Sequence, residues 1–128
     1  MNPTRFNEIV TKRLTTCEAV LCKKADEYAS DTDRLHNFKR AAAMTDTTPE
    51  KALEGMWVKH LVSVQDLINF PDRATLESIA EKMGDTINYV LLLEAILMER
   101  MDGRVEERRE PARPIMVQTT GRIIYPDE

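Results

Sequence analysis

The segment from Ile87 to Leu97 constrains the fold most, because apolar residues occupy nearly every side of a helix drawn over it. A helix that is apolar all round is buried by neighbouring helices or by a second subunit. The surrounding pattern predicts a long helix from Thr75 to about Asp102, closed by Gly103. We therefore expect a helical assembly that self-associates, with a homodimer as the commonest outcome.

Three more helices precede this one. Apolar residues at three- and four-residue steps predict the first helix from about Pro3 to about Ala29. A short second helix is expected around residues 35–42, after a turn at 30–33. Thr48, Pro49 and Glu50 form a start signal for the third, which should reach about Asn69. The sequence thus predicts an all-α, four-helix bundle-like single domain over residues 1–103.

Residues 104–128 have a different pattern. Pro111 and Pro114 disfavour helix, and short apolar runs flank Thr119–Arg122. A small hairpin, an extended arm over a partner subunit and a disordered tail all fit this C-terminal arm.

Length, composition and net charge limit the class of protein and its cellular compartment. With 128 residues, 42% of them hydrophobic, the chain can build a core without disulfides, and a net charge of −4 disfavours coating of nucleic-acid polymers or anionic membranes. Cys17 and Cys22 fall on different faces of the first helix, which disfavours a disulfide between them and favours a reduced compartment. No apolar leader or membrane-length span is evident, so we expect a cytoplasmic protein without a membrane partner.

An acidic stripe is the main candidate for chemistry. Glu77, Glu81 and Asp85 recur at four-residue spacing, with Asn88 three residues on, so all lie along one side of the fourth helix. Like charges this close repel unless a cation lies between them. Mg²⁺ fits carboxylate oxygens best, and no Cys or His stands at zinc-ligand spacing around the stripe. The alternative is a solvated face of a surface helix.

The third helix carries a second polar line. Lys59, Ser63 and Asp66 share a side of that helix, with His60 beside them. Lys59 fits either an anionic substrate oxygen or a pair with Glu81. His60 fits either a boundary residue or a functional base.

The loop after the first helix mixes polar and aromatic residues. Tyr28 and Phe38 are suited to stack on a nucleobase, and Asn37 can read a base or sugar edge. Lys24 and Arg34 can bind phosphates. An ordinary solvated loop is the alternative.

Two blocks of this sequence resemble a known family. The blocks are Lys24-Ala-Asp-Glu-Tyr-Ala29 with Asp33-Arg-Leu-His-Asn-Phe-Lys39, and Lys59-His-Leu-Val-Ser63 with Glu81-Lys-x-x-Asp85-x-x-Asn88-Tyr89. Together they resemble small phage-encoded helical proteins of the nucleotide-modification-associated type and, more distantly, MazG-like all-α nucleotide pyrophosphohydrolases. The likeness spans roughly residues 20–98.

The resemblance implies a magnesium-dependent enzyme of phage nucleotide metabolism, in the host cytoplasm, that cleaves a nucleoside triphosphate between its α- and β-phosphates. It also implies a helical bundle that forms a homodimer or homotetramer. The wider group supplies Glu-x-x-Glu from one helix and Glu-x-x-Asp from a later one. Here the second element is one residue longer, Glu81-x-x-x-Asp85, and the first is absent from the third helix. Asp66, or Glu27 and Asp33 from the loop, would have to complete the site.

These arguments assign roles to eleven residues. Catalysis is expected from Glu81, Asp85 and His60, magnesium binding from Glu77, Glu81 and Asp85, and substrate binding from Lys24, Tyr28, Arg34, Asn37, Phe38, Lys59 and Asn88. Two alternatives stay open: a module that binds or sequesters a nucleotide without hydrolysing it, and a structural protein whose carboxylates pair with lysines such as Lys59 and Lys82.

Overall fold

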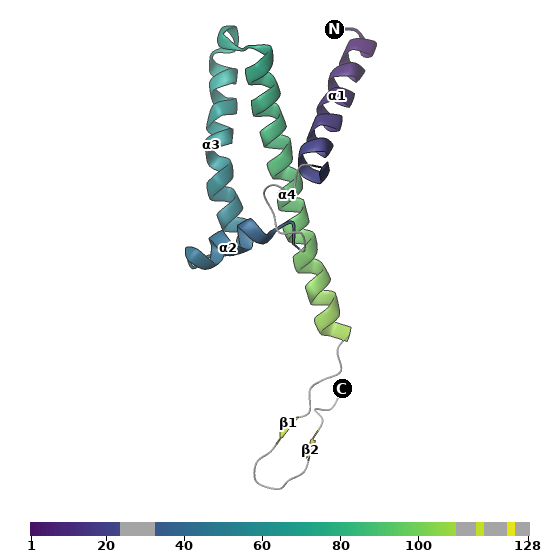
Figure 1. The fold of residues 1–128 in the computed structure, drawn as a ribbon, viewed down its shortest axis with the longest axis vertical. Coiled ribbons are helices and arrows are strands. Elements are labelled where there is room, and N and C mark those ends of the chain that lie inside the picture. Colours follow the sequence, from purple (N-terminus) through teal and green to yellow (C-terminus); the bar gives the residue numbers. More distant parts are fainter. Residues whose placement is uncertain (24–32, 110–114, 117–122, 125–128) are drawn as a thin grey trace. The chain divides into compact units, whose positions relative to one another are not determined.

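The computed structural model describes residues 1–23, 33–109, 115–116 and 123–124, and its fold is all-α, as predicted. The helices are α1 (Pro3–Glu18), α2 (His36–Met44), α3 (Pro49–Asn69) and α4 (Leu76–Arg109) (Figure 1). A π-helical turn, η1 (Ala19–Lys23), continues α1, and a 3₁₀ turn, η3 (Pro71–Arg73), links α3 to α4. The chain divides into two compact units, Met1–Leu97 and Met98–Glu128, and the candidate site lies within the first.

Local capping explains where α1, α3 and α4 begin. The Asn2 side chain accepts a hydrogen bond from the Arg5 amide at 2.8 Å, and Thr48 Oγ1 accepts one from the Lys51 amide at 3.3 Å. Before α4, Thr75 and Ser78 cap each other reciprocally: each backbone amide donates to the other hydroxyl, at 2.9 and 3.0 Å. These side chains satisfy amides that have no partner inside the helix.

The core lies where α2, α3 and α4 meet. Leu35, Phe38, Leu53 and Ile96 form one buried cluster. Partly buried hydrophobic residues pack around it: Met56, Trp57, Tyr89, Leu92 and Leu93. In Figure 1, α3 and α4 run antiparallel, and α2 lies across the N-terminal end of α3. The cluster therefore joins the short second helix to the α3–α4 hairpin.

The α1 helix meets α4 at a glycine. The Cys17 thiol is buried, and its Sγ lies 3.9 Å from the Gly84 carbonyl oxygen. A Cβ atom added at Gly84 would meet Arg13 Nη1 at 3.4 Å. The Cys17 side chain therefore packs against the α4 backbone at a position that carries no side chain.

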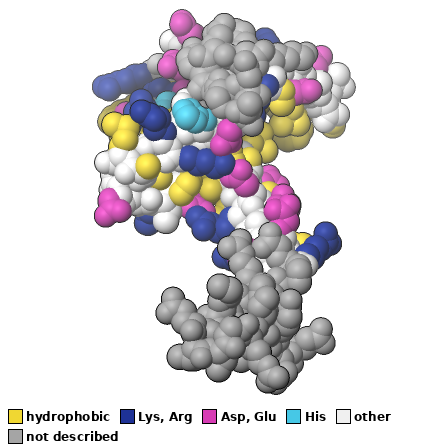
Figure 2. All heavy atoms as spheres, turned by 60° about the horizontal axis from the view of Figure 1, so that its bottom comes forward, with side chains coloured by type: hydrophobic (Ala, Val, Ile, Leu, Met, Phe, Trp, Pro, Cys, Tyr) yellow, Lys and Arg dark blue, Asp and Glu magenta, His cyan; other side chains and the backbone are white. Residues whose placement is uncertain are grey.

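The apolar run that predicted a buried helix is only partly covered within the described chain. Leu92, Leu93 and Ile96 belong to the core or pack against it. Val90, Leu91 and Leu97 remain 48%, 41% and 46% exposed. Figure 2 shows the same trait on one face of the molecule, where hydrophobic side chains reach the surface among charged ones.

Two boundaries differ from the prediction. The fourth helix does not end at Gly103 but continues to Arg109, because residues 104–109 are mostly good helix formers of mixed charge and Pro111 comes only later. The α-helical part of the first helix ends at Glu18 and continues as the π turn, and the expected continuation over residues 24–29 lies outside the described residues. In the C-terminal arm, β1 (Ile115–Met116) and β2 (Ile123–Ile124) pair antiparallel, with Ile115 opposite Ile124, as in the hairpin alternative.

Among the described helices, we find none with the length and apolarity that a bilayer crossing requires.

Candidate functional site

A cavity of about 330 Å³ opens between the C-terminal end of the first helical segment, α2, α3 and α4. Its polar lining consists of Arg34, Asn37, Asp85 and Asn88. Its apolar lining consists of Val20, Leu21, Phe38, Met56, Tyr89 and Leu92. A mostly apolar hollow with a few convergent polar groups is the usual form of a small-molecule site.

Asp33 fixes the α2 wall of this cavity. Its Oδ1 accepts a hydrogen bond from the Leu35 amide at 2.9 Å, and its Oδ2 accepts one from Lys39 Nζ at 2.8 Å. The Lys39 hydrogen bond and then the Leu35 amide lower the pKa of Asp33 below its ordinary value. This turn starts α2 and so places Arg34, Asn37 and Phe38 at the cavity.

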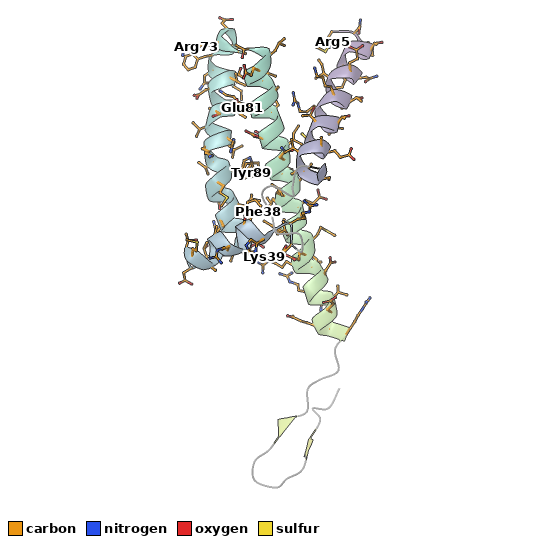
Figure 3. The ribbon with its side chains drawn as sticks, viewed as in Figure 1. Arg5, Phe38, Lys39, Arg73, Glu81 and Tyr89 are labelled. Carbon is orange, nitrogen blue, oxygen red and sulfur yellow. The ribbon has the colours of Figure 1, made fainter. Side chains whose placement is uncertain are left out.

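The aromatic wall comes from α2 and α4. Phe38 is buried, and Tyr89 reaches from α4 toward α3 (Figure 3). The Tyr89 ring is stacked with Trp57, with centroids 6.4 Å apart and planes 9° apart, and its centroid lies 5.0 Å from that of His60. Burial, and then the charge of Asp85, raise the pKa of Tyr89, so its phenol stays neutral.

Asp85 and His60 form a pair at the edge of the cavity. Asp85 Oδ2 lies 3.2 Å from His60 Nδ1, and the two side chains are 38% and 23% exposed. Asp85 lines the cavity, whereas His60 stands outside its lining. His60 therefore meets the cavity through its contact with Asp85.

One polar atom in the cavity wall lacks a partner. Asn88 Oδ1 is buried and accepts no hydrogen bond within the described part of the chain. A buried, unsatisfied acceptor costs free energy, so such an atom normally has a partner, such as an ordered water or a ligand in the cavity. Trp57 Nε1 is also buried without a hydrogen-bond partner among the described residues, although Trp57 does not line the cavity.

A second cavity, of about 280 Å³, lies between α1 and α4. Glu81, Asp85 and Asn88 line it from α4, and Arg13, Thr16 and Cys17 line it from α1. Asp85 and Asn88 are therefore shared by both cavities. Glu81 and Asp85 face a common space here, whereas Glu77 is exposed and lines neither cavity.

Of the three predicted magnesium ligands, two carboxylates, Glu81 and Asp85, line one cavity. Within the described ranges, no three Asp, Glu, His or Cys side chains come together as a metal-binding group. Mg²⁺ commonly uses one or two carboxylates and completes its shell with waters and substrate phosphates. Glu81 and Asp85 fit that pattern, and Glu77 has no evident place in it.

The structure brings together many of the predicted site residues. Arg34, Asn37, Phe38, Asp85 and Asn88, named from separate parts of the sequence, line one cavity. Glu81 lines the neighbouring cavity, and His60 contacts Asp85.

Other predicted residues are placed elsewhere. Lys59 is exposed and lines neither cavity, and the α3 residue that meets Asp85 is its neighbour His60. Asp66, proposed as a substitute ligand, is also exposed. Asp33 is engaged by Lys39. Lys24, Glu27 and Tyr28 lie outside the described residues.

The sequence argument did not assign Tyr89 or Trp57 to the site. Tyr89 had a usable signal, because it follows Asp85 by four residues and must lie on the same side of α4. No such sequence signal marked the apolar residues of the cavity wall, because their helical spacing is equally typical of core residues. These residues are Val20, Leu21, Met56 and Leu92.

Comparison of the chain with protein-family models, with curated proteins and with solved structures gave no match.

Proposed function

We propose that this chain binds a nucleotide in the cavity between α2, α3 and α4, and that it is a magnesium-dependent nucleoside triphosphate pyrophosphohydrolase. The supporting observation is that side chains of several chemical kinds, from separate segments of the chain, line the same cavity. A cation, two amides, a carboxylate and two aromatic rings, from Arg34 to Tyr89, line one small cavity. That combination suits a ligand with a flat base, hydrogen-bonding edges and anionic oxygens.

The base is assigned to the aromatic side of the cavity. Phe38 and the neutral Tyr89 offer ring surfaces, and the buried Asn88 Oδ1 offers an acceptor for a base N–H group. Asn37 supplies a second amide for a base or sugar edge. Arg34 is assigned to a phosphate, because a guanidinium forms paired hydrogen bonds with phosphate oxygens.

Hydrolysis is assigned to the carboxylate pair on α4. Glu81 and Asp85 would hold the magnesium ion from the cavity that they share. The bound ion would supply neutralisation of phosphate charge and a more acidic water. Asp85, which lines both cavities, would accept the proton of an attacking water, and the contact with His60 would hold its carboxylate in position.

The test is a panel of canonical and modified nucleoside triphosphates incubated with the protein and magnesium. We expect pyrophosphate and nucleoside monophosphate from at least one of them, and a large loss of product in Asp85→Asn and Glu81→Gln. Glu94→Gln is the matched control, because Glu94 is an exposed carboxylate of the same helix. Absence of pyrophosphate from every substrate, with the helical fold intact, refutes hydrolysis.

A second candidate is a module that binds a nucleotide without turnover. Its specific support is that the described acidic groups form a pair and not a cluster of three. Thermal unfolding with nucleotides, with and without magnesium, separates the two functions. A binder is stabilised by the nucleotide, since ligands of the folded state raise its melting temperature, but it releases no pyrophosphate.

We place this activity in the cytoplasm, or in the host cytoplasm if the chain is phage-encoded. Nucleoside triphosphates are substrates of that compartment, and the two cysteines are both free, Cys17 buried and Cys22 exposed, which fits a reducing setting.

A further inference from the structure

The cavity between α1 and α4 contains a cation to which the proposed function gives no role. Arg13 lines this second cavity from α1, and Glu81 and Asp85 line it from α4. The Arg13 side chain is half-buried, and it forms no ion pair or hydrogen bond with the rest of the described chain. A guanidinium carries five N–H donors, which normally have partners when they are withdrawn from water. The donors of Arg13 are therefore open to a ligand.

The position of this guanidinium is fixed relative to α4 at Gly84. A Cβ atom built at Gly84 would lie 3.4 Å from Arg13 Nη1, so the end of the arginine side chain lies close to the α4 backbone. Residues 81, 84, 85 and 88 are related by steps of three and four, which places them on one side of the helix. The cation from α1 is thus next to the side of α4 that carries both carboxylates.

Arg13 and Glu81 do not pair across this cavity. Within the described ranges Glu81, like Arg13, forms no ion pair or hydrogen bond. Two opposite charges that line one cavity of about 280 Å³ without pairing leave room for a ligand that carries both signs. A magnesium–phosphate complex is such a ligand, because its cation suits carboxylates and its oxygens suit a guanidinium.

We propose that Arg13 binds the two outer phosphates of the nucleoside triphosphate, and that the second cavity is a subsite for magnesium pyrophosphate. This inference rests on the proposed function for the identity of the nucleotide. Val20, Asp85 and Asn88 line both cavities, so the two cavities adjoin along α4. A phosphate chain that begins in the first cavity can therefore continue past Asp85 into the second.

This arrangement makes Arg13 a determinant of phosphate-chain length. Arg34 lines only the first cavity, where it is assigned to the phosphate next to the sugar. A nucleoside monophosphate has no group for the second cavity, whereas a triphosphate fills both. The chain should therefore prefer ligands that carry the outer phosphates, for a reason that is separate from recognition of the base.

The first experiment uses inorganic pyrophosphate as the probe, so it requires neither a base nor turnover. Binding to the full chain is measured by isothermal titration calorimetry with saturating magnesium. We expect the wild type to bind pyrophosphate more tightly than inorganic phosphate. Arg13→Gln should lose affinity for pyrophosphate by about tenfold or more, as expected when hydrogen bonds to a charged group are removed. Arg13→Lys should lose less, because it keeps the charge without the paired donors.

Lys12→Gln is the matched control, because Lys12 is the adjacent cation of α1 and is exposed outside the second cavity. It should bind pyrophosphate as the wild type does. Absence of binding to the wild type, or equal affinity in Arg13→Gln, overturns this inference even if nucleotides are hydrolysed. Binding that depends on Arg13 supports the subsite even if no nucleotide is hydrolysed, so the two proposals can fail separately.

The second experiment uses the wild-type chain and does not depend on the folding of a variant. Phenylglyoxal, which modifies guanidinium groups, is applied with and without magnesium pyrophosphate, and the modified residues are identified by mass spectrometry of peptides. We expect magnesium pyrophosphate to reduce the modification of Arg13. Arg5, an exposed arginine of the same helix, should be modified equally in both samples. Absence of protection at Arg13, or equal protection of both arginines, overturns the inference.

Discussion

His60 on α3 and Asp85 on α4 meet with Nδ1 and Oδ2 3.2 Å apart, so the carboxylate shared by the two cavities is held by the neighbouring helix. The Tyr89 ring lies 5.0 Å from the His60 ring. The three side chains therefore connect the α3–α4 interface directly to the candidate site. Changes on either helix should be measurable as changes in the proposed activity.

Asp85→Asn tests the central residue of the proposal. We expect turnover of the hydrolysed nucleotide to fall by about 100-fold or more, because a positioned general base typically contributes that much. Glu81→Gln should instead raise the magnesium concentration needed for half-maximal rate. Pyrophosphate release across a magnesium titration measures both effects. Unchanged turnover in Asp85→Asn would remove this residue from the mechanism.

His60 is predicted to be a positioning residue. We expect His60→Ala to lower kcat by about tenfold, in the range for residues that support a metal-binding group from behind, with a smaller effect on KM. His60→Gln should recover part of this loss, since its amide N–H can still donate to Asp85. Equal kcat values for the two variants would argue against positioning through Asp85.

The turn at Asp33 predicts a dependence of stability on pH. Its carboxyl pKa is lowered in the folded state by Lys39 and then by the Leu35 amide, so the charged form stabilises the fold above the unfolded-state pKa, which is about 3.9. This contribution is lost as the pH falls through the lower, folded-state pKa. We expect Asp33→Asn to lower the melting temperature at pH 7, and the gap to the wild type to shrink below about pH 4.

A double-mutant cycle with Lys39→Met provides the control for that turn. If the two side chains act on each other, the double variant should lose less than the two single variants together. Strict additivity at neutral pH would contradict the pairing seen between Asp33 and Lys39.

Leu53 tests the location of the core. It is 1% exposed, and we expect Leu53→Ala to lower the free energy of unfolding by about 2–5 kcal/mol, as for other buried leucines. Leu76 is 87% exposed, and Leu76→Ala should stay within about 0.5 kcal/mol. Denaturant unfolding of the two variants makes the comparison. Similar losses of unfolding free energy in the two variants would show that the core does not lie around Leu53.

Gly84 tests the contact between α1 and α4. Gly84→Ala should raise the free energy of unfolding by about 0.5–1 kcal/mol, because alanine favours helix and its Cβ would meet only the flexible end of Arg13, at 3.4 Å. Gly84→Leu should instead lower it by about 1–3 kcal/mol, because the larger side chain would overpack against α1. Thermal unfolding of both variants checks the opposite signs.

Some elements were predictable because their determinants are local. The start of α3 follows from Thr48 and Pro49, and its end from Pro71, so the predicted and observed limits agree. The end of α4 was missed because Gly103 ends a helix only when the chain leaves helical geometry there, and the residues that follow favour helix.

The site was predictable in part. Asp85, Asn88 and Asn37 are polar residues within or beside apolar patterns, and such exceptions are visible in a sequence. The sequence could not predict whether Lys59 or His60 faces α4, because adjacent residues differ by about 100° around a helix. Only the packing of α3 on α4 decides which of the two faces inward.

The π turn at Ala19–Lys23 determines which side chains form one wall of the cavity. A π turn contains one more residue than the α-helical turn it replaces, and Val20 and Leu21 within it both contribute to the wall. Removing one residue from this segment would let the helix wind normally, and the side chains within the turn would take new angular positions. The inner surface facing Asn88 would then be rebuilt from different side chains, without any change to the residues of α4.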